Sequence, residues 1–271
     1  MGRFDGKVVF VTGAARGQGR NHALRLAEEG ADLALVDIGS AGTVENPAYP
    51  VSSAGDLEAT RQEVEALGRR ALAFEVDVRD HAGLQAAADE TAAALGGIDH
   101  VIANAGISDG FRPVWELSAD NWQTMIDINL SGVFYTCKAT VPHLRRRGAG
   151  SALVLVGSIA SIKFYGWLSH YTAAKAGVRA LAGALAKELG PEDIRCNSLH
   201  PAAIDTTMTD AMVQLGGVAK EQLLQQFRDS QLIPHNIEIT DSTAAALWLL
   251  SDEARFVTGL ELLVDAGESK K

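Results

Sequence analysis

A tyrosine and a lysine one helical turn apart are the first candidates for chemistry. Tyr171 and Lys175 stand at positions i and i+4, so they share one face of any helix that forms there. A free phenol, with a pKa of about 10, is a poor base at neutral pH, but a neighbouring ammonium favours the phenolate. Tyr171 is then able to take a proton from an alcohol, or to give one to a carbonyl, while hydride moves to or from a nicotinamide. Ser158, at the end of a predicted strand, is placed to hydrogen-bond the same substrate oxygen.

A glycine-rich turn lies near the start of the chain, between a predicted strand and a predicted helix. Gly13 lets the strand turn sharply, and glycines at 17 and 19 let backbone N–H groups approach a pyrophosphate at the positive end of the helix. A strand before and a helix after such a turn are the context that dinucleotide binding requires. The predicted phosphate-binding residues are Gly13, Arg16, Gly17, Gln18 and Gly19.

An acidic residue ends the second predicted strand. The Asp37 carboxylate is placed to accept hydrogen bonds from both hydroxyls of an adenine ribose, and it would repel a 2′-phosphate. The sequence therefore favours NAD(H) over NADP(H). Arg16 is the opposing feature, because a guanidinium near the ribose is able to hold a 2′-phosphate. Its interpretation as a pyrophosphate or surface contact is preferred.

Two further strand ends carry candidate cofactor-binding residues. Asp77 and Val78 follow the third predicted strand, and Asn104, Ala105 and Gly106 follow the fourth. Both lie on the carboxyl edge of the sheet, where open α/β folds bind ligands. For Asn104 a second interpretation stays open, namely a turn residue that stabilises the end of the strand.

The elements that position these residues alternate along the chain. Apolar, β-branched-rich segments predict strands at 7–12, 33–37, 71–77, 98–104, 152–158, 194–200 and 260–265. Segments of helical period lie between them, at 17–29, 57–67, 81–95, 118–147, 171–189 and 242–250. This alternation predicts right-handed βαβ crossovers. We expect one α/β domain over residues 1–271, with a seven-stranded, mostly parallel, doubly wound sheet flanked by helices.

Two stretches interrupt the alternation. Residues 38–55 form a long polar connection that leaves the sheet beside the expected adenosine site. Residues 202–236 contain a helical apolar stripe that includes Met208 and Met212, and we interpret this stretch as a substrate lid. Phe164, Tyr165, Trp167 and Trp115 are predicted to add apolar walls. These aromatic side chains, with the two methionines, predict a hydrophobic secondary alcohol or ketone as the substrate.

Composition excludes several classes of protein. Of the 271 residues, 47% are hydrophobic and 21% charged, which excludes a mostly disordered chain. The net charge of −10 argues against nucleic-acid or membrane partners. Two cysteines give no disulfide framework, and no secretory signal or membrane span is predicted, so we expect a cytoplasmic protein. The seven histidines have no metal-binding spacing, and no metal site is predicted.

The motifs together resemble the short-chain dehydrogenase/reductase family over about residues 5–267. The resemblance implies a Rossmann fold, and a catalytic triad of Ser158, Tyr171 and Lys175. It implies that Lys175 contacts the nicotinamide ribose and lowers the pKa of Tyr171, and that Asn129 holds a water in a proton relay. It also implies a homotetramer. The residues expected to meet the nicotinamide half are Tyr171, Lys175, Pro201, Ile204 and Thr206. Pro201-Ala202 departs from the Pro-Gly of many members, which leaves the path of that loop open.

A narrower resemblance concerns the 38–55 segment and the C-terminal motifs. They are similar to those of the mycofactocin-associated, carveol dehydrogenase-like branch. That branch implies an NAD that stays bound through turnover and is re-oxidised by a redox peptide cofactor. A lid over the adenosine half is a physical route to such retention, and the alternative is a surface loop without that role.

Two other functions remain to be weighed. A 3-oxoacyl-carrier-protein reductase would prefer NADP(H) and carry a basic docking patch for its acidic carrier, and both Asp37 and the net charge weigh against it. A non-catalytic nucleotide sensor on the same fold typically lacks triad residues, whereas Ser158, Tyr171 and Lys175 are all present.

Overall fold

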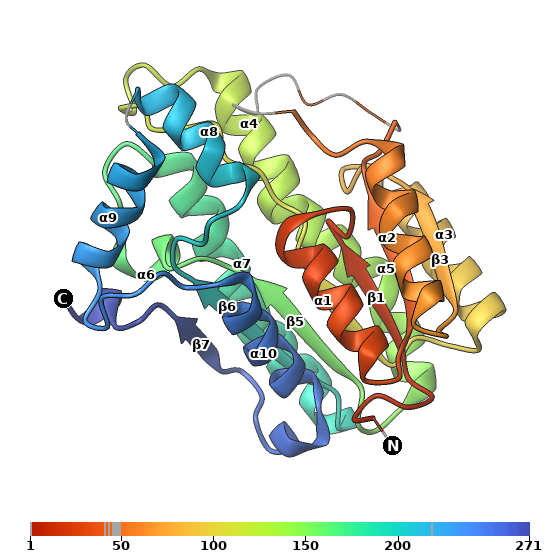
Figure 1. The fold of residues 1–271 in the computed structure, drawn as a ribbon. Helices are drawn as coiled ribbons and strands as arrows, with labels where there is room; N and C mark the ends of the chain where they lie inside the picture. Colours follow the sequence, from red (N-terminus) through yellow and green to blue (C-terminus); the bar gives the residue numbers. More distant parts are fainter. Residues whose placement is uncertain (1, 41, 43, 45–49, 218) are drawn as a thin grey trace.

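A single parallel sheet forms the centre of the protein (Figure 1). The structure is a computed structural model that describes residues 2–40, 42, 44, 50–217 and 219–271. Within these residues seven strands pair in the order β3-β2-β1-β4-β5-β6-β7. The strands are β1 (Val8–Thr12), β2 (Asp32–Asp37), β3 (Ala71–Glu75), β4 (His100–Ala103), β5 (Ala152–Val156), β6 (Arg195–Pro201) and β7 (Glu261–Val264). The predicted doubly wound sheet is confirmed, and every pair in it is parallel.

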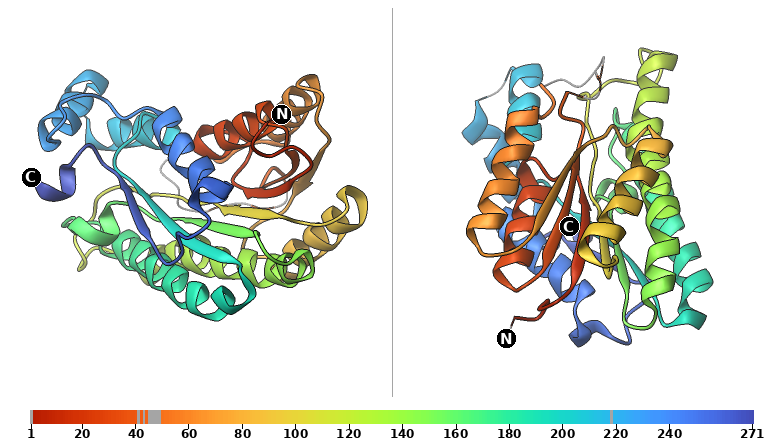
Figure 2. Two further views of the ribbon diagram at one scale, coloured as in Figure 1. Left: turned by 90° about the horizontal axis from the view of Figure 1, so that it is seen from below. Right: turned by 90° about the vertical axis from the view of Figure 1, so that its right-hand side faces the viewer.

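Helices cover both faces of the sheet (Figure 2). One face packs against α1 (Gly17–Glu28), α2 (Ala54–Ala66) and α10 (Ile239–Leu250). The other packs against α3 (His81–Leu95), α5 (Gly132–Arg147) and α7 (Ser169–Leu189). All residues of β1 and β5 are buried, because their apolar side chains alternate between two covered faces. The strand order reverses between β1 and β4, which opens a crevice at the carboxyl edge.

The predicted helix at 118–147 is divided in the structure. It consists of α4 (Ala119–Ile126), a π-helical segment at Asp127–Ser131 and then α5. Ser118 caps the start, because its hydroxyl accepts a hydrogen bond from the Asn121 N–H at 3.0 Å. π segments inside α-helices are frequent at functional sites, and this one contains Asn129.

Helix boundaries elsewhere differ from the prediction by a few residues. The start of α2 lies at Ala54 instead of residue 57, because Ser53 and Asp56 form a capping box there. Residues 202–236 contain two helices, α8 (Thr207–Gly216) and α9 (Lys220–Ser230), where the sequence predicted one apolar stripe. A short helix, α6 (Ala160–Lys163), lies between β5 and α7.

Both cysteines, Cys137 and Cys196, are free and buried. Among the helices in the described part of the chain, none combines the length and the apolar character that crossing a membrane requires.

Candidate active site

Two adjoining hollows open at the carboxyl edge of the sheet. The first runs from the glycine-rich turn to Asp37 and Asp77. The second encloses about 410 Å³ beside Ser158, Tyr171 and Lys175. The hollows have six lining residues in common, which are Gln18, Asn104, Gly106, Ile107, Thr206 and Met208. A ligand that spans both would therefore meet the glycine turn at one end and the predicted triad at the other.

The glycine-rich turn leaves room for a phosphate group. Gly13 has a φ of +68° and Gly17 a φ of +57°, values that favour glycine. A Cβ on Gly19 would lie 2.0 Å from the Gly13 carbonyl oxygen, so only glycine lets the helix approach this closely. The first turn of α1 carries no acidic side chain that would repel a phosphate. This cradle fits a dinucleotide pyrophosphate.

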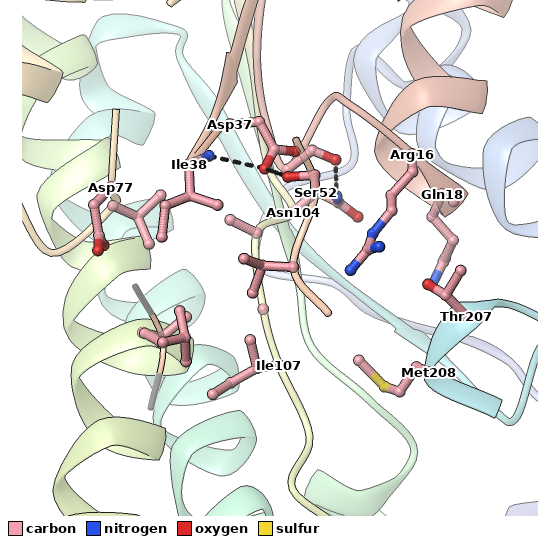
Figure 3. A pocket seen from close by; sticks show the side chains of 18 of the residues that line it. Arg16, Gln18, Asp37, Ile38, Ser52, Asp77, Asn104, Ile107, Thr207 and Met208 are labelled. Carbon is pink, nitrogen blue, oxygen red and sulfur yellow. Dashed lines mark hydrogen bonds between the residues drawn. The ribbon is translucent and has the colours of Figure 1, made fainter. Parts of the chain in front are cut away.

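The Asp37 carboxylate lies at the far end of the first hollow (Figure 3). Its Oδ2 accepts a hydrogen bond from the Ala15 N–H at 2.9 Å, and its Oδ1 accepts from the Ile38 N–H at 2.8 Å. The Ser52 hydroxyl also donates to Oδ1. A carboxylate has about four acceptor positions, so the group is fixed in place and still able to accept from a ribose. Sequence reasoning missed Ser52, whose role depends on a contact across the inserted segment.

The described part of the inserted segment lies against this hollow. Arg16 Nη2 donates to the Pro50 carbonyl oxygen at 2.5 Å, which joins the glycine turn to the end of the segment. Val44 lines the hollow, and a Cβ on Gly42 would lie 3.0 Å from an Asp77 carboxylate oxygen. Residues 41, 43 and 45–49 of the predicted loop lie outside the described residues.

Some of the predicted strand-end residues line the first hollow, and one of them also stabilises the end of a strand. Asp77, Val78, Ala105 and Gly106 line the first hollow, where the Asp77 carboxylate pairs with the Arg79 guanidinium. Asn104 lines both hollows, but its amide nitrogen donates to the carbonyl oxygens of residues 12 and 13 at 3.1 and 3.3 Å. These bonds fit the second interpretation of Asn104, a residue that stabilises the strand end.

The predicted triad surrounds the second hollow. Tyr171 and Lys175 share one face of α7, and Lys175 Nζ lies 5.9 Å from the centroid of the Tyr171 ring. Lys175 Nζ also donates to the Val156 carbonyl oxygen at 3.0 Å, which fixes α7 against the end of β5. Ser158 follows that strand, and its hydroxyl hydrogen-bonds the Tyr171 phenol. The structure therefore brings all three side chains together.

Burial acts on both ionisable groups of the triad. It raises the pKa of the Tyr171 phenol, and the hydrogen bond with Ser158 lowers that pKa in part. Burial also lowers the pKa of Lys175 to about 8. In the protein alone, the phenol is therefore neutral at pH 7 and Lys175 carries most of its charge. The expected lowering of the Tyr171 pKa by Lys175 must act against this desolvation.

We expect Lys175→Met to shift the pH dependence of alcohol oxidation upward by about one pH unit. Oxidation requires the phenolate of Tyr171, so its rate rises with pH. The ammonium, charged below pH 8, helps to form the phenolate, and without it a higher pH is needed. The measurement is kcat/KM against pH, with Lys187→Met on the exposed side of α7 as the control. Profiles that superimpose would contradict this electrostatic role.

Asn129 supports the loop that follows β4. Its Oδ1 accepts from the Ile107 N–H at 2.7 Å, and its Nδ2 donates to the Ile107 carbonyl oxygen at 2.8 Å. A Cβ on Gly106 would lie 2.9 Å from Asn129 Oδ1 and 3.3 Å from Lys175 Nζ. Glycine at 106 thus lets these two groups approach the same point. Because both ends of the Asn129 amide are already bonded to Ile107, its side chain acts first as a brace.

The residues after β6 lie where the nicotinamide half was expected. Pro201, Ile204 and Thr206 line the second hollow, and Thr206 is the N-cap residue of α8. The Ala202 N–H donates to the Val264 carbonyl oxygen at 3.0 Å. The Pro-Ala pair is therefore held against the neighbouring strand β7.

The prediction of apolar walls for the substrate pocket is wrong for three of the aromatic residues. Met208 lines both hollows, but Phe164 and Trp167 are 66% and 63% exposed and line neither. Both have a positive φ, of 56° and 63°. Of the other predicted walls, Tyr165 lines the second hollow, whereas Trp115 is 79% exposed and does not. Leu168, which was not predicted, also lines it. The side chain of Met212 lies outside the described part of the chain.

Two buried histidines beside the triad were not predicted to have a role. His200 Nδ1 lies 3.2 Å from the Ser158 carbonyl oxygen, and its Nε2 lies 2.8 Å from the Ser198 hydroxyl. Burial lowers the pKa of His200 to about 4, so it is a neutral brace behind Ser158. His170 Nε2 lies 2.5 Å from a carboxylate oxygen of the buried Asp109. This pair joins the start of α7 to the loop after β4.

The donor set around the hollows is not that of a metal centre. In residues 2–40, 42, 44, 50–217 and 219–271, no three His, Cys, Asp or Glu side chains are grouped so that they could hold a metal ion.

Comparison with known proteins identifies relatives of this chain. A family model described as Enoyl-(Acyl carrier protein) reductase matches residues 13–269. The chain is 41% identical over 279 residues to a (-)-trans-carveol dehydrogenase from Rhodococcus erythropolis, with 100% of both proteins covered.

Two solved structures extend the similarity to the fold. The carveol dehydrogenase from Mycobacterium avium in complex with NAD has a TM-score of 0.96 and 43% identity, with 100% of both chains covered. The short chain dehydrogenase from Mycobacterium paratuberculosis bound to NAD has a TM-score of 0.91 and 36% identity, also over 100% of both chains.

Proposed function

The chain belongs to the short-chain dehydrogenase/reductase family and is an NAD-dependent alcohol dehydrogenase with a Rossmann fold, and from that premise we propose its substrate and the roles of its residues. The substrate is a hydrophobic secondary alcohol or ketone of terpenoid size, and Tyr171 is the general acid and base. The observation that carries this proposal is that Ser158, Tyr171 and Lys175 line one hollow that adjoins the dinucleotide cradle.

Each triad residue has one task during oxidation. Ser158 holds the alcohol oxygen, and Tyr171 takes its proton. Before this transfer, the ammonium of Lys175 stabilises the phenolate form of Tyr171 that takes the proton. When bound, the nicotinamide accepts the hydride that leaves the alcohol carbon. The proton on Tyr171 then leaves past Lys175 toward a water near Asn129, a route supported by the approach of both residues to Gly106.

The same contacts assign the cofactor-binding residues. The glycine turn, with Arg16 and Gln18, holds the pyrophosphate, and Asp37 accepts hydrogen bonds from the adenine ribose. The adenine lies near Asp77 and Val78, while the nicotinamide half meets the residues of the shared wall and the loop after β6. The role of these residues rests on their place around the two hollows, and the lack of an acidic side chain in the first turn of α1 supports it.

The lining of the second hollow supports an apolar substrate. Ile107, Phe111, Leu168, Leu223 and Phe227 face it together with Met208. The relatives named carveol dehydrogenase fit a cyclic terpenoid alcohol.

We also propose that NAD stays bound and is re-oxidised in place by a redox peptide cofactor of the mycofactocin type. Two contacts support retention, namely the Ser52 hydroxyl on Asp37 and the Arg16 guanidinium on the Pro50 carbonyl oxygen. Both hold the end of the inserted segment over the adenosine half. Release of the nucleotide would require these contacts to break.

The assembly and location that we propose are a homotetramer and the cytoplasm. Small residues with accessible surface follow one stripe of α7, which suits close helix packing between subunits: Ala173, Ala176, Gly177, Ala180 and Gly183. Phe134 on α5 is 45% exposed and supports the same interface. The free thiols of Cys137 and Cys196 fit a reducing compartment.

The nucleotide content of the purified protein tests this proposal. We expect mass spectrometry and absorbance to find one nicotinamide per chain after gel filtration. Secondary alcohols should then be oxidised with an artificial acceptor but slowly with added NAD⁺ alone, because the bound nucleotide does not exchange. Protein that emerges empty and turns over rapidly on added NAD⁺ would contradict retention but not the dehydrogenase activity.

Two other results would favour the alternatives. Strong selectivity for NADPH with a 3-oxoacyl substrate would indicate a carrier-protein reductase. It would contradict the preference for NAD that the Asp37 carboxylate predicts. Nucleotide binding without turnover of any alcohol or ketone would indicate a sensor. It would contradict the catalytic activity that the complete triad predicts.

A further inference from the structure

A buried carboxylate lies in the second hollow, outside the triad. Glu268 begins a short 3-10 helix (Glu268–Lys270) just after β7, and its side chain lines the same hollow as Ser158 and Tyr171. The residue is only 4% exposed. Hydrogen bonds from the backbone N–H groups of Gly267 and Ser269 to the Asp265 carboxylate fix this turn. The C-terminal turn lies beside α6 and α9 (Figure 1).

The contacts of Glu268 involve one of its two oxygens. The Tyr165 hydroxyl donates to Oε1, and Lys163 Nζ lies 3.4 Å from the same atom. Among the residues that the structure describes, none donates a hydrogen bond to Oε2. Buried carboxylates normally have hydrogen-bond partners, because desolvation without them is costly. Oε2 has no such donor, and it is not among the fully buried unpaired atoms of the described residues, so part of its surface stays accessible to a ligand.

The Glu268 carboxylate is held at a fixed position relative to the triad, which binds the alcohol oxygen of the substrate. Tyr165, which holds Oε1, belongs to the loop between Ser158 and Tyr171, so the carboxylate is fixed relative to the triad. Leu168, Leu223 and Phe227 give the hollow apolar walls. A substrate whose alcohol oxygen lies at Ser158 and Tyr171 has Glu268 as a further polar contact, and the hollow is also lined by the neutral polar residues Ser108, Thr209, Gln226 and Ser230. Among these lining residues Glu268 is the carboxylate.

We propose that Glu268 is a specificity-determining residue that accepts a hydrogen bond from a second hydroxyl of the substrate. The substrate class is then a hydroxylated alicyclic alcohol, or the matching hydroxyketone. This inference rests on the proposed function. The donor is a neutral hydroxyl because Lys163 already provides a cation beside the carboxylate, so a substrate ammonium is not needed to balance its charge.

The physical effect is discrimination against substrates without the donor. An apolar alcohol would cover Oε2 and leave it desolvated and unpaired, whereas a hydroxyl would restore the lost hydrogen bond. Sites with buried polar groups reject analogues that lack the matching group far more strongly than apolar pockets reject an extra methylene.

Paired substrates test the proposal. The ratio of kcat/KM for each of the 1,2-, 1,3- and 1,4-cyclohexanediols to that for cyclohexanol is measured in the wild type, Glu268→Leu and Glu268→Gln. We expect the wild type to favour at least one diol by about tenfold or more, and Glu268→Leu to lose that preference. Glu268→Gln keeps an acceptor without the charge, so its ratio should fall at least threefold. Glu90→Leu on the exposed side of α3 is the matched control and should keep the wild-type ratio.

Each other outcome has a distinct meaning. A merely structural role for Glu268 would lower kcat/KM for all substrates in proportion and leave the ratio unchanged, which would overturn the inference. If Glu268→Leu does not fold, Glu268→Gln decides the question, and an unchanged ratio in that variant would also overturn the inference. A preference for 4-aminocyclohexanol over every diol would show that a cation is recognised, and would also overturn it. If the wild type oxidises no alcohol, the proposed function itself fails.

Discussion

Tyr171→Phe is expected to lower kcat for alcohol oxidation by about 10³-fold, the scale of a lost general base. The phenol is the one group of the triad that is able to take the alcohol proton, since Ser158 hydrogen-bonds it and Lys175 is a cation. Phenylalanine keeps the ring and removes only the oxygen. Steady-state rates with a secondary alcohol measure the effect, and NAD binding should stay within about threefold of the wild type because the cradle is unaltered.

The control for this variant is Tyr135→Phe, which removes a phenol on α5 that lines neither hollow. Its turnover should match that of the wild type. Near-normal turnover in Tyr171→Phe would place the proton transfer elsewhere, and the proposed mechanism would be wrong.

Asp37→Ala is expected to lower the ratio of kcat/KM for NAD⁺ to that for NADP⁺ by about 10²-fold or more. A hydrogen bond to a charged group contributes about 1.5–3 kcal/mol, so the loss of the carboxylate weakens NAD⁺ binding strongly. The same change removes the repulsion of a 2′-phosphate. Both nucleotides are compared on protein from which any bound nucleotide has been removed.

Two control variants test whether the change in cofactor preference comes from the Asp37 carboxylate itself. Ser52→Ala removes one hydrogen bond to Asp37 and should change the ratio by only a few fold. Asp120→Ala, at an exposed position of α4, should leave it unchanged. A wild type that uses NADP⁺ as well as NAD⁺ would show that Asp37 does not discriminate between them.

The parts of the site that the sequence predicted are those set by local rules. Gly13 and Gly19 are recognisable because a strand, a tight turn and a helix must follow one another, and the geometry at Gly19 excludes any side chain. Tyr171 and Lys175 follow from helical spacing, and Ser158 from the end of a strand. The parallel, doubly wound sheet follows from the alternation of strands and helices, whereas the order of its strands comes from the structure.

The parts that were missed depend on contacts between distant segments. Glu268 meets Tyr165 across the fold, and Asp109 meets His170, and no local pattern marks either pair. Phe164 and Trp167 are apolar, which predicted inward-facing walls, but their left-handed backbone turns them outward. The helix α9 has no buried residue, and its short apolar face of Leu223 and Phe227 lines the second hollow, so it was not recognised as a separate helix.

The wall shared by the two hollows dictates an order of events. Gly106, Ile107 and Met208 belong to both cavities, so the nicotinamide must pass the place where the alcohol will rest. An alcohol that arrives early would obstruct the entrance of the dinucleotide. When protein stripped of its nucleotide is reloaded, binding should therefore be compulsory in order, with NAD⁺ before the alcohol, and alcohol that is present beforehand should slow the association of NAD⁺.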